Sequence, residues 1–172
     1  MKPTEAMPLA KAAALKAIEL DPKLAEGHTS LAYVLLSYEW DLKAAEAEFI
    51  KALALNPASS NARHWFSHYY MAQGDLPKAT TEMQAALKLE PLSPSINIGI
   101  GWCYYYGQQF DKAIEQYRSV VDADPGFPLA HQTLAMALVQ SKMYEEAISE
   151  YQKAVTLSGG SPTTIAGLAT AY

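Results

Sequence analysis

The most constraining feature of this sequence is a proline that recurs every 34 or 35 residues, at Pro22, Pro57, Pro91 and Pro125. A further step of 34 residues reaches Gly159, a residue that also ends helices. Small residues recur at fixed distances before these stops, at Ala10, Ala45, Ala79, Ala113 and Ala147, and at Ala17, Ala52, Ala86, Val120 and Ala154. A period of this length predicts an array of repeated units that bury their apolar faces against one another.

Each unit of this period reads as two helices joined by a short turn. In residues 94–125, Ile100, Gly101 and Tyr104 have the spacing of one helix face. After Gly107 the same spacing returns at Phe110, Ala113, Ile114, Tyr117 and Val120. The intervening polar residues do not alternate as a strand does, so the pattern predicts an all-α chain of antiparallel helix pairs.

The repeat resembles the tetratricopeptide repeat (TPR), a 34-residue unit with small residues at its eighth, twentieth and twenty-seventh positions and a proline near its end. The eighth position here is held by Ala32, Ser67, Gly101 and Ala135, and the twenty-fourth by Phe49, Met83, Tyr117 and Tyr151. The resemblance covers nearly the whole chain. It implies an α-α superhelix, which is a TPR solenoid of antiparallel helix pairs.

The sequence departs from the family pattern in two places. At the fourth position, where the family often has tryptophan, this chain has His28, Arg63, Asn97 and His131. One extra residue falls near positions 38–40. We expect neither departure to change the fold.

The repeat pattern predicts a single array over residues 1–172. Its parts are the second half of a repeat at 1–22, full repeats at 26–57, 60–91, 94–125 and 128–159, and the first helix of a further repeat at 162–172. Serine followed by proline opens two helices, at Ser93-Pro94 and Ser161-Pro162, where we expect the serine to cap the helix. Because both ends fall within a repeat, we expect a segment of a longer protein or open ends that pair with another copy.

Charge and composition exclude several classes of function. The net charge is -5 and the 13 Lys and Arg residues are dispersed, which argues against a nucleic-acid partner. No run of about 20 apolar residues indicates a membrane span, so we expect no membrane partner. Cys103 is the only cysteine, which excludes an internal disulfide and a cysteine metal cluster. A lone buried thiol fits a reducing compartment, and we expect a cytoplasmic location.

The sequence contains no Gly-rich phosphate loop, nucleophile elbow or metalloprotease helix motif, so we expect no enzyme and no cofactor. Its carboxylates are expected at exposed helix positions.

His64 and His68 are four residues apart and share one helix face, but a zinc site needs three or four ligands. No Cys, Asp or Glu is placed convincingly beside them, so we expect no native metal site. His28 and His131 are expected to pack between helices.

The TPR resemblance implies a concave groove that is lined by the first helix of each repeat and binds peptides. The family's groove positions correspond here to Tyr33, Leu36, His64, His68, Met71, Ile98, Trp102, Tyr105, Tyr106, Gln132, Met136 and Val139, with Trp65 at the rim. Most of these residues are aromatic or apolar, which favours an apolar or aromatic peptide or helix as the partner. The alternative is that tyrosines such as Tyr105 pack between neighbouring repeats.

The chaperone-binding branch of the family grips a terminal carboxylate with lysines, asparagines and an arginine. The corresponding positions here hold Thr29, Tyr33, Trp65, Ser95 and Gly99. None of these side chains is basic, so a partner that binds through its terminal carboxylate is not expected.

The leading hypothesis is a non-enzymatic scaffold for protein interactions. From resemblance alone, the chain looks like the C-terminal TPR arrays of large bacterial regulators. The features that carry this likeness are Trp40-Asp41, His64-Trp65, Gly101-Trp102 and residues 158–162. Two alternatives stay open, namely a self-assembly module whose open ends mediate oligomerisation and an RNA-binding helical repeat. The terminal prolines, the 34-residue spacing and the negative charge oppose RNA binding.

Overall fold

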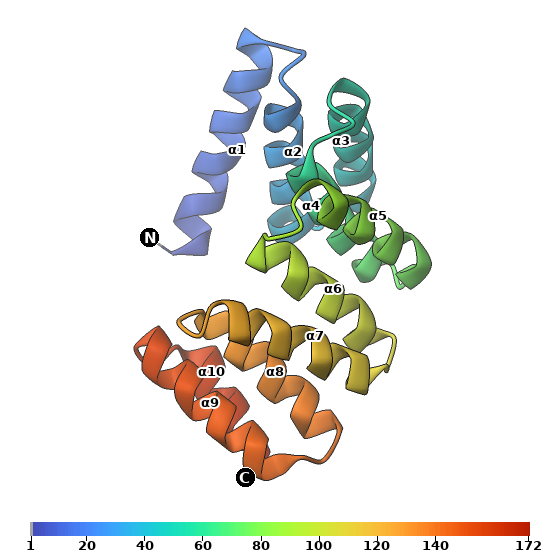
Figure 1. The fold of residues 1–172 in the computed structure, drawn as a ribbon. Coiled ribbons are helices and arrows are strands. Elements are labelled where there is room, and N and C mark those ends of the chain that lie inside the picture. Colours follow the sequence, from blue (N-terminus) through green and yellow to red (C-terminus); the bar gives the residue numbers. More distant parts are fainter. Residues whose placement is uncertain (1) are drawn as a thin grey trace. The chain divides into compact units, whose positions relative to one another are not determined.

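The computed structural model describes residues 2–172, and their regular secondary structure is helical throughout (Figure 1). The elements are α1 (Pro3–Leu20), α2 (Ala25–Val34), η1 (Leu35–Glu39), α3 (Leu42–Leu55), α4 (Ser60–Ala72), α5 (Leu76–Leu89), α6 (Pro94–Tyr106), α7 (Phe110–Ala123), α8 (Pro128–Gln140), α9 (Tyr144–Ser158) and α10 (Pro162–Ala171). The prediction of an all-α chain is confirmed. Within the predicted first segment, 1–22, Met1 lies outside the described residues.

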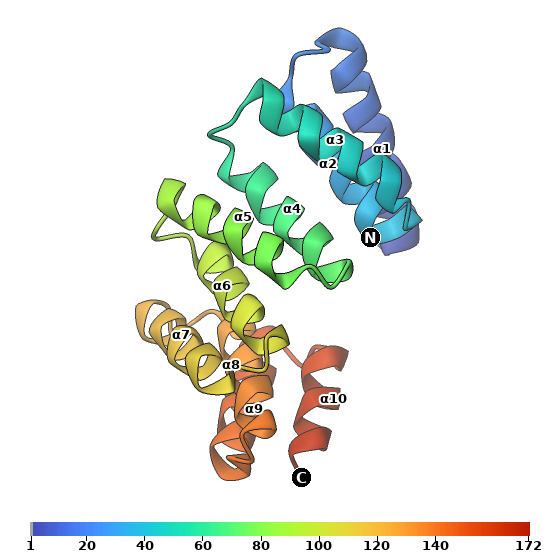
Figure 2. The ribbon, with the colours of Figure 1, turned by 90° about the vertical axis from the view of Figure 1, so that its right-hand side faces the viewer.

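The chain divides into two compact units, an N-terminal unit that ends at Glu90 and a C-terminal unit that begins at Pro91. In the N-terminal unit, α1 packs on α2, α2 on α3, and α4 on α5, and Figure 1 shows α1, α2 and α3 side by side. In the C-terminal unit, α6 packs on α7, α7 on α8, α8 on α9, and α9 on α10. Figure 2 shows the α4–α5 pair and the α8–α9 pair, each within its own unit. The single array over residues 1–172 stays a prediction.

Small side chains lie where the helices of a pair approach most closely. The periodic residues Ala45, Ala52, Ala79, Ala86, Ala113, Ala147 and Ala154 are all 0% exposed. Their side chains let two backbones come together without leaving a void, as close-packed interiors require. The expectation does not extend to α1, where Ala10 is exposed and Ala17 is only half-buried.

The turn inside each helix pair contains a residue with left-handed backbone. These residues are Trp40 (φ 57°), Gly74 (φ 75°), Gln108 (φ 56°) and Lys142 (φ 61°). The residue after each one donates its backbone N–H to a carbonyl near the end of the preceding helix; Asp75 bonds Tyr70 at 2.9 Å in this way. Glycine adopts this conformation freely, whereas the three larger residues pay a steric cost.

A π-helix absorbs the extra residue that the sequence places near 38–40. This helix, η1, continues α2 directly and ends at Trp40, which is 72% exposed. One π-turn accommodates an added residue without breaking the helix. Lys11 of α1 holds the end of η1 through an ion pair with Glu39 at 2.7 Å.

The fourth position of each repeat carries a polar side chain that joins two elements, an arrangement we call the polar clamp. In the C-terminal unit, His131 Nε2 lies 2.9 Å from the Pro125 carbonyl, and its Nδ1 lies 2.5 Å from Glu150 Oε2. A carbonyl only accepts, so Nε2 carries a proton. Lys153 also donates to Glu150, at 2.7 Å. We expected the carboxylates at exposed positions, but Glu150 is only 7% exposed because these two partners neutralise it.

The clamp recurs with different chemistry in the other repeats. The three further clamps are His28 with the Pro22 carbonyl and Glu48, Arg63 with the Pro57 carbonyl and Glu82, and Asn97 with the Pro91 carbonyl and Gln116. Each one ties the proline that follows a helix pair to the second helix of the next pair. In all four clamps the fourth-position side chain therefore joins two elements by hydrogen bonds, and His28 and His131 are also buried.

The two predicted serine caps form differently from our expectation. Ser93 and Ser161 occupy the cap positions, and proline follows each of them, but neither side chain bonds a backbone N–H of its helix. Their hydroxyls contact Ser95 Oγ at 3.1 Å and Thr163 Oγ1 at 2.9 Å instead.

Across residues 2–172, no helix is both long enough and apolar enough to cross a bilayer.

Candidate functional site

Two neighbouring helices of the N-terminal unit bring four rings together. Tyr33 of α2 lies 4.3 Å from Trp65 of α4, measured between ring centroids. The His64 ring stacks on Trp65 at 4.9 Å and 12°, and the His68 ring lies 5.2 Å from Trp65. All four side chains are half-buried, so each keeps part of its ring open to solvent. We call these four residues the first aromatic surface.

The two histidines of this surface are uncharged at neutral pH. Burial lowers the pKa of His64, and burial together with the charge of His64 lowers the pKa of His68 to about 4. Their Nε2 atoms lie 3.1 Å apart. Two imidazolium ions would repel each other at this separation, whereas neutral rings share one N–H···N hydrogen bond. Met71, half-buried one turn further along α4, adds a thioether to the same helix.

A second group of rings lies on α6 in the C-terminal unit. Trp102 meets Tyr105 edge-on at 5.5 Å and stacks on Tyr106 at 5.5 Å and 22°. Trp102 and Tyr105 are half-buried, while Tyr106 is 55% exposed. We call these three residues the second aromatic surface. Met136 of α8 is also half-buried and packs, like Trp102 and Tyr105, against the core of this unit.

Ile98 does not belong to this surface. Its side chain is 2% exposed and packs in the core with Ala113 and Ile114 of α7. The resemblance assigns it to the groove, but its side chain is buried in the core of the unit and is not open to a ligand. Tyr106, which the resemblance also assigns to the groove, is 55% exposed and is the most open of the groove residues on α6.

The inner side of the second aromatic surface rests on Tyr117 of α7, whose ring lies 6.2 Å from Trp102. Tyr117 is 0% exposed, and its hydroxyl is the buried side-chain polar atom, among residues 2–172, that has no hydrogen-bond partner. Burial raises the pKa of this phenol well above its usual range. Tyr117 therefore supports the surface as a neutral packed ring.

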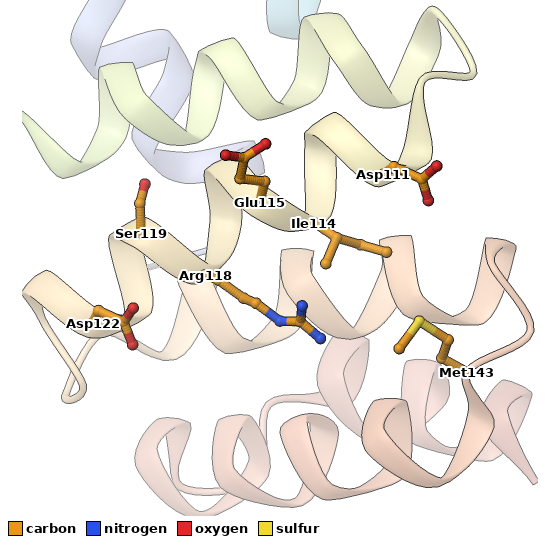
Figure 3. Close-up of a pocket in the computed structure, with 7 residues that line it drawn as sticks. All are labelled: Asp111, Ile114, Glu115, Arg118, Ser119, Asp122 and Met143. Atoms are coloured by element: carbon orange, nitrogen blue, oxygen red, sulfur yellow. The ribbon is translucent and has the colours of Figure 1, made fainter.

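A pocket of about 470 Å³ is lined by residues of α7 and by Met143, which precedes α9 (Figure 3). Its lining is Asp111, Ile114, Glu115, Arg118, Ser119, Asp122 and Met143. Figure 3 shows Arg118 extending from α7 toward the side on which Met143 lies. Arg118 bonds Glu146 at 2.7 Å, so its charge is already matched. The sequence pattern indicated only a solvated helix face here.

Metal-binding capacity in the described chain is limited. No group of three or more His, Cys, Asp or Glu side chains in residues 2–172 could hold a metal ion. His64 and His68, both on α4, together offer two neighbouring ring nitrogens.

Comparison with protein-family models identifies the repeat. A tetratricopeptide repeat model matches residues 66–128, and a second tetratricopeptide repeat model matches residues 104–157. Together the two matches span more than half of the chain. The chain belongs to the TPR family. A search among curated proteins found no match.

Solved TPR structures share the fold of this chain. A thermophilic TPR protein of Thermus thermophilus superposes with a TM-score of 0.87 at 18% identity, over 98% of this chain and 91% of that one. PilF of Pseudomonas aeruginosa gives a TM-score of 0.77 at 21% identity, over 95% of this chain and 74% of that one. YrrB, described as a TPR protein with an unusual peptide-binding site, gives 0.65 at 21% identity, over 93% and 82% of the two chains.

These likenesses establish the fold class, an all-α TPR solenoid. The TPR fold supports a protein-interaction scaffold in general, and TPR proteins are generally non-catalytic scaffolds. The TPR repeats here differ from the family pattern mainly in the polar clamps at the fourth position.

Proposed function

We propose that this protein is a non-enzymatic scaffold that binds a short apolar or aromatic peptide, or a partner helix, through its aromatic surfaces. The observation that carries the proposal is the first aromatic surface. Its four rings come from the first helices of two neighbouring repeats and hold one another in place while staying half-open to solvent. Rings that are already fixed lose little conformational freedom when a ligand covers them.

The chemistry of both surfaces suits an apolar ligand. Neutral His64 and His68 place no positive charge beside Trp65, and the second aromatic surface contributes only tryptophan and tyrosine. Aromatic anchors of this kind can each contribute about 2 kcal/mol or more to binding. The positions that grip a terminal carboxylate in the chaperone-binding branch lack basic residues here. A peptide recognised through internal apolar side chains is therefore the proposed partner.

The fold likeness to YrrB agrees with peptide binding, because that protein is described as having a peptide-binding site. From the sequence resemblance we further propose that the array serves within a larger bacterial regulator. Its partner would then be a segment of another regulatory protein.

The test is a peptide-library screen followed by affinity measurements on three tryptophan variants. Trp65→Ala and Trp102→Ala each remove a ring from one aromatic surface, and Trp40→Ala removes a 72% exposed ring that belongs to neither. A peptide bound at a given surface should lose about 30-fold in affinity, equivalent to about 2 kcal/mol, when that surface loses its tryptophan.

Trp40→Ala should leave peptide affinity unchanged. Melting temperatures measured in parallel decide between a binding role and a packing role. If Trp102→Ala lowers stability more than affinity, Trp102 is a core residue; if only Trp40→Ala weakens binding, the aromatic surfaces are not the site.

Self-assembly is a second candidate, favoured by exposed leucines on α1. Leu9 is 60% exposed and Leu15 is 48% exposed, and such side chains could pack against another copy. Light scattering behind a sizing column separates the candidates. A mass that stays near 18.8 kDa at every concentration supports the peptide scaffold, and a mass that rises with concentration supports self-assembly.

A further inference from the structure

We propose that His64 and His68 form a two-nitrogen site for a divalent late transition-metal ion such as Ni²⁺, Cu²⁺ or Zn²⁺. The spacing of four residues alone makes such a pair common and weak evidence. The structure adds that the two rings bring the same nitrogen, Nε2, together, with 3.1 Å between the two atoms.

The separation of the two nitrogens matches metal coordination. Imidazole nitrogens bind Zn²⁺ at about 2.0–2.1 Å, so two of them about 95° apart around one ion lie about 3.1 Å from each other. Square-planar and octahedral ions prefer angles near this value, and a tetrahedral ion needs only a slight opening of the pair. An ion could therefore enter between the rings with little rearrangement.

A metal ion binds imidazole through a ring nitrogen that carries no proton. In the free protein one ring donates its Nε2 proton to the other. On binding, that proton moves to Nδ1 of its own ring, and both Nε2 lone pairs point at the ion.

The neighbouring rings hold this arrangement. His64 stacks on Trp65 at 12°, and Tyr33 of α2 contacts the Trp65 ring in turn. A ligand whose orientation is already fixed binds with a smaller entropic cost. Arg63, which precedes His64 in the sequence, has its charge paired with Glu82 at 2.7 Å.

The other two histidines cannot supply such a site. Both ring nitrogens of His28 and of His131 are engaged in polar clamps, each with one proline carbonyl and one carboxylate. Both of these rings are also buried, at 1% and 3% exposed, whereas His64 and His68 are half-buried. An ion held by two nitrogens keeps further coordination positions for water or for a ligand from outside.

The test is calorimetric titration of the full chain with Ni²⁺ and with Zn²⁺ in a buffer that does not bind metal. We expect one saturable site per chain. Loss of even an indirect partner of a metal ligand costs about 10–100-fold in affinity, so His64→Gln and His68→Gln should each lose more than about tenfold. The double variant should show no saturable heat.

Trp65 supplies an optical readout that a surface-bound ion would not give. Cu²⁺ bound at the pair lies beside the indole that stacks on His64, so it should quench Trp65 fluorescence in step with occupancy. Trp65→Phe should lose this quenching and keep the heat of binding. Bound Ni²⁺ should also raise the melting temperature of the wild type and not that of the double variant.

Three results would overturn the proposal: no saturable binding by the wild type, equal binding by the histidine variants, or quenching that survives in Trp65→Phe. Circular dichroism checks that each variant is folded, and the Trp65→Phe chain, which keeps both ligands, decides the question if the glutamine variants are unstable. The inference does not depend on peptide binding, because the probe is the metal ion alone.

Discussion

Gly101 of α6 lies directly against the ring of Tyr117 on α7, so closely that a Cβ atom at position 101 would fall 2.1 Å from Tyr117 Cε1. The repeat pattern placed both residues in the interface of one helix pair, at the eighth and twenty-fourth positions. The structure shows that the tyrosine ring occupies the volume that any other residue at 101 would need.

Gly101→Ala should therefore destabilise the protein by about 1–3 kcal/mol, since the buried ring must move. Alanine is the better helix former by about 1 kcal/mol, so a loss of stability would show that the clash outweighs helix propensity. Urea denaturation measures the free energy of unfolding. Gly126→Ala, in the turn between α7 and α8, is the control for an added methyl group without a close clash, because its Cβ meets only Asp124 Oδ1 at 3.4 Å. Equal effects of the two variants would contradict this placement.

Tyr117→Phe should leave the free energy of unfolding unchanged or raise it by about 1 kcal/mol. The variant keeps the ring against Gly101 and removes a buried hydroxyl that has no hydrogen-bond partner. Tyr151→Phe gives a comparison at the same repeat position. A clear loss of stability in Tyr117→Phe would mean that the hydroxyl has a partner, such as a bound water.

The helix pairs could be predicted from the sequence because their packing depends on local, periodic constraints. Small residues such as Ala45 and Ala113 recur where backbones meet, and a proline or glycine ends each pair. The polar clamps could not be foreseen, because each joins a fourth-position side chain to a partner on a second helix. The pairing of His131 with Glu150 depends on how the two helices are rotated, which spacing does not determine.

The candidate site was predictable only in part for a related reason. Helical spacing placed His64 and His68 on one face, and the structure agrees. Spacing does not tell how much of a face its neighbours cover, so Ile98 was assigned to the groove although it is buried in the core of the C-terminal unit. The convergence of two Nε2 atoms also depends on side-chain rotamers, which a single sequence does not reveal.

The clamp between His131 and Glu150 should make stability depend on pH. Burial raises the pKa of Glu150. Hydrogen bonds from Lys153 and His131, together with the charges of these two residues, lower that pKa by more than burial raises it, so the pKa of Glu150 lies below its usual range. A carboxyl whose pKa is lowered on folding stabilises the protein above its unfolded pKa of about 4.3, and this stability is lost as the pH falls through the lower folded value.

Glu150→Gln should thus be less stable than the wild type at pH 7, by about 1–3 kcal/mol, and the difference should shrink below about pH 4. The measurement is urea denaturation of both proteins across this pH range. Glu146→Gln, which removes a half-exposed partner of Arg118, is the control and should change stability by less than about 1 kcal/mol at any pH. A difference that persists unchanged in acid would show that the Glu150 contribution is not electrostatic.

Gln108→Gly should stabilise the protein, although it removes a side chain. Gln108 has a φ of 56° in the turn between α6 and α7, a conformation that costs a side-chain-bearing residue about 1–2 kcal/mol and costs glycine little. Glycine is also more flexible in the unfolded chain, which offsets part of the gain, so a net increase of about 0.5–1 kcal/mol is expected. Gln109→Gly is the matched control, because Gln109 has a φ of -92° and its side chain accepts a hydrogen bond from Lys112 at 2.8 Å. The melting temperature should rise for Gln108→Gly and fall for Gln109→Gly. A lower melting temperature in Gln108→Gly would mean that the Gln108 side chain contributes more stability than the backbone strain costs.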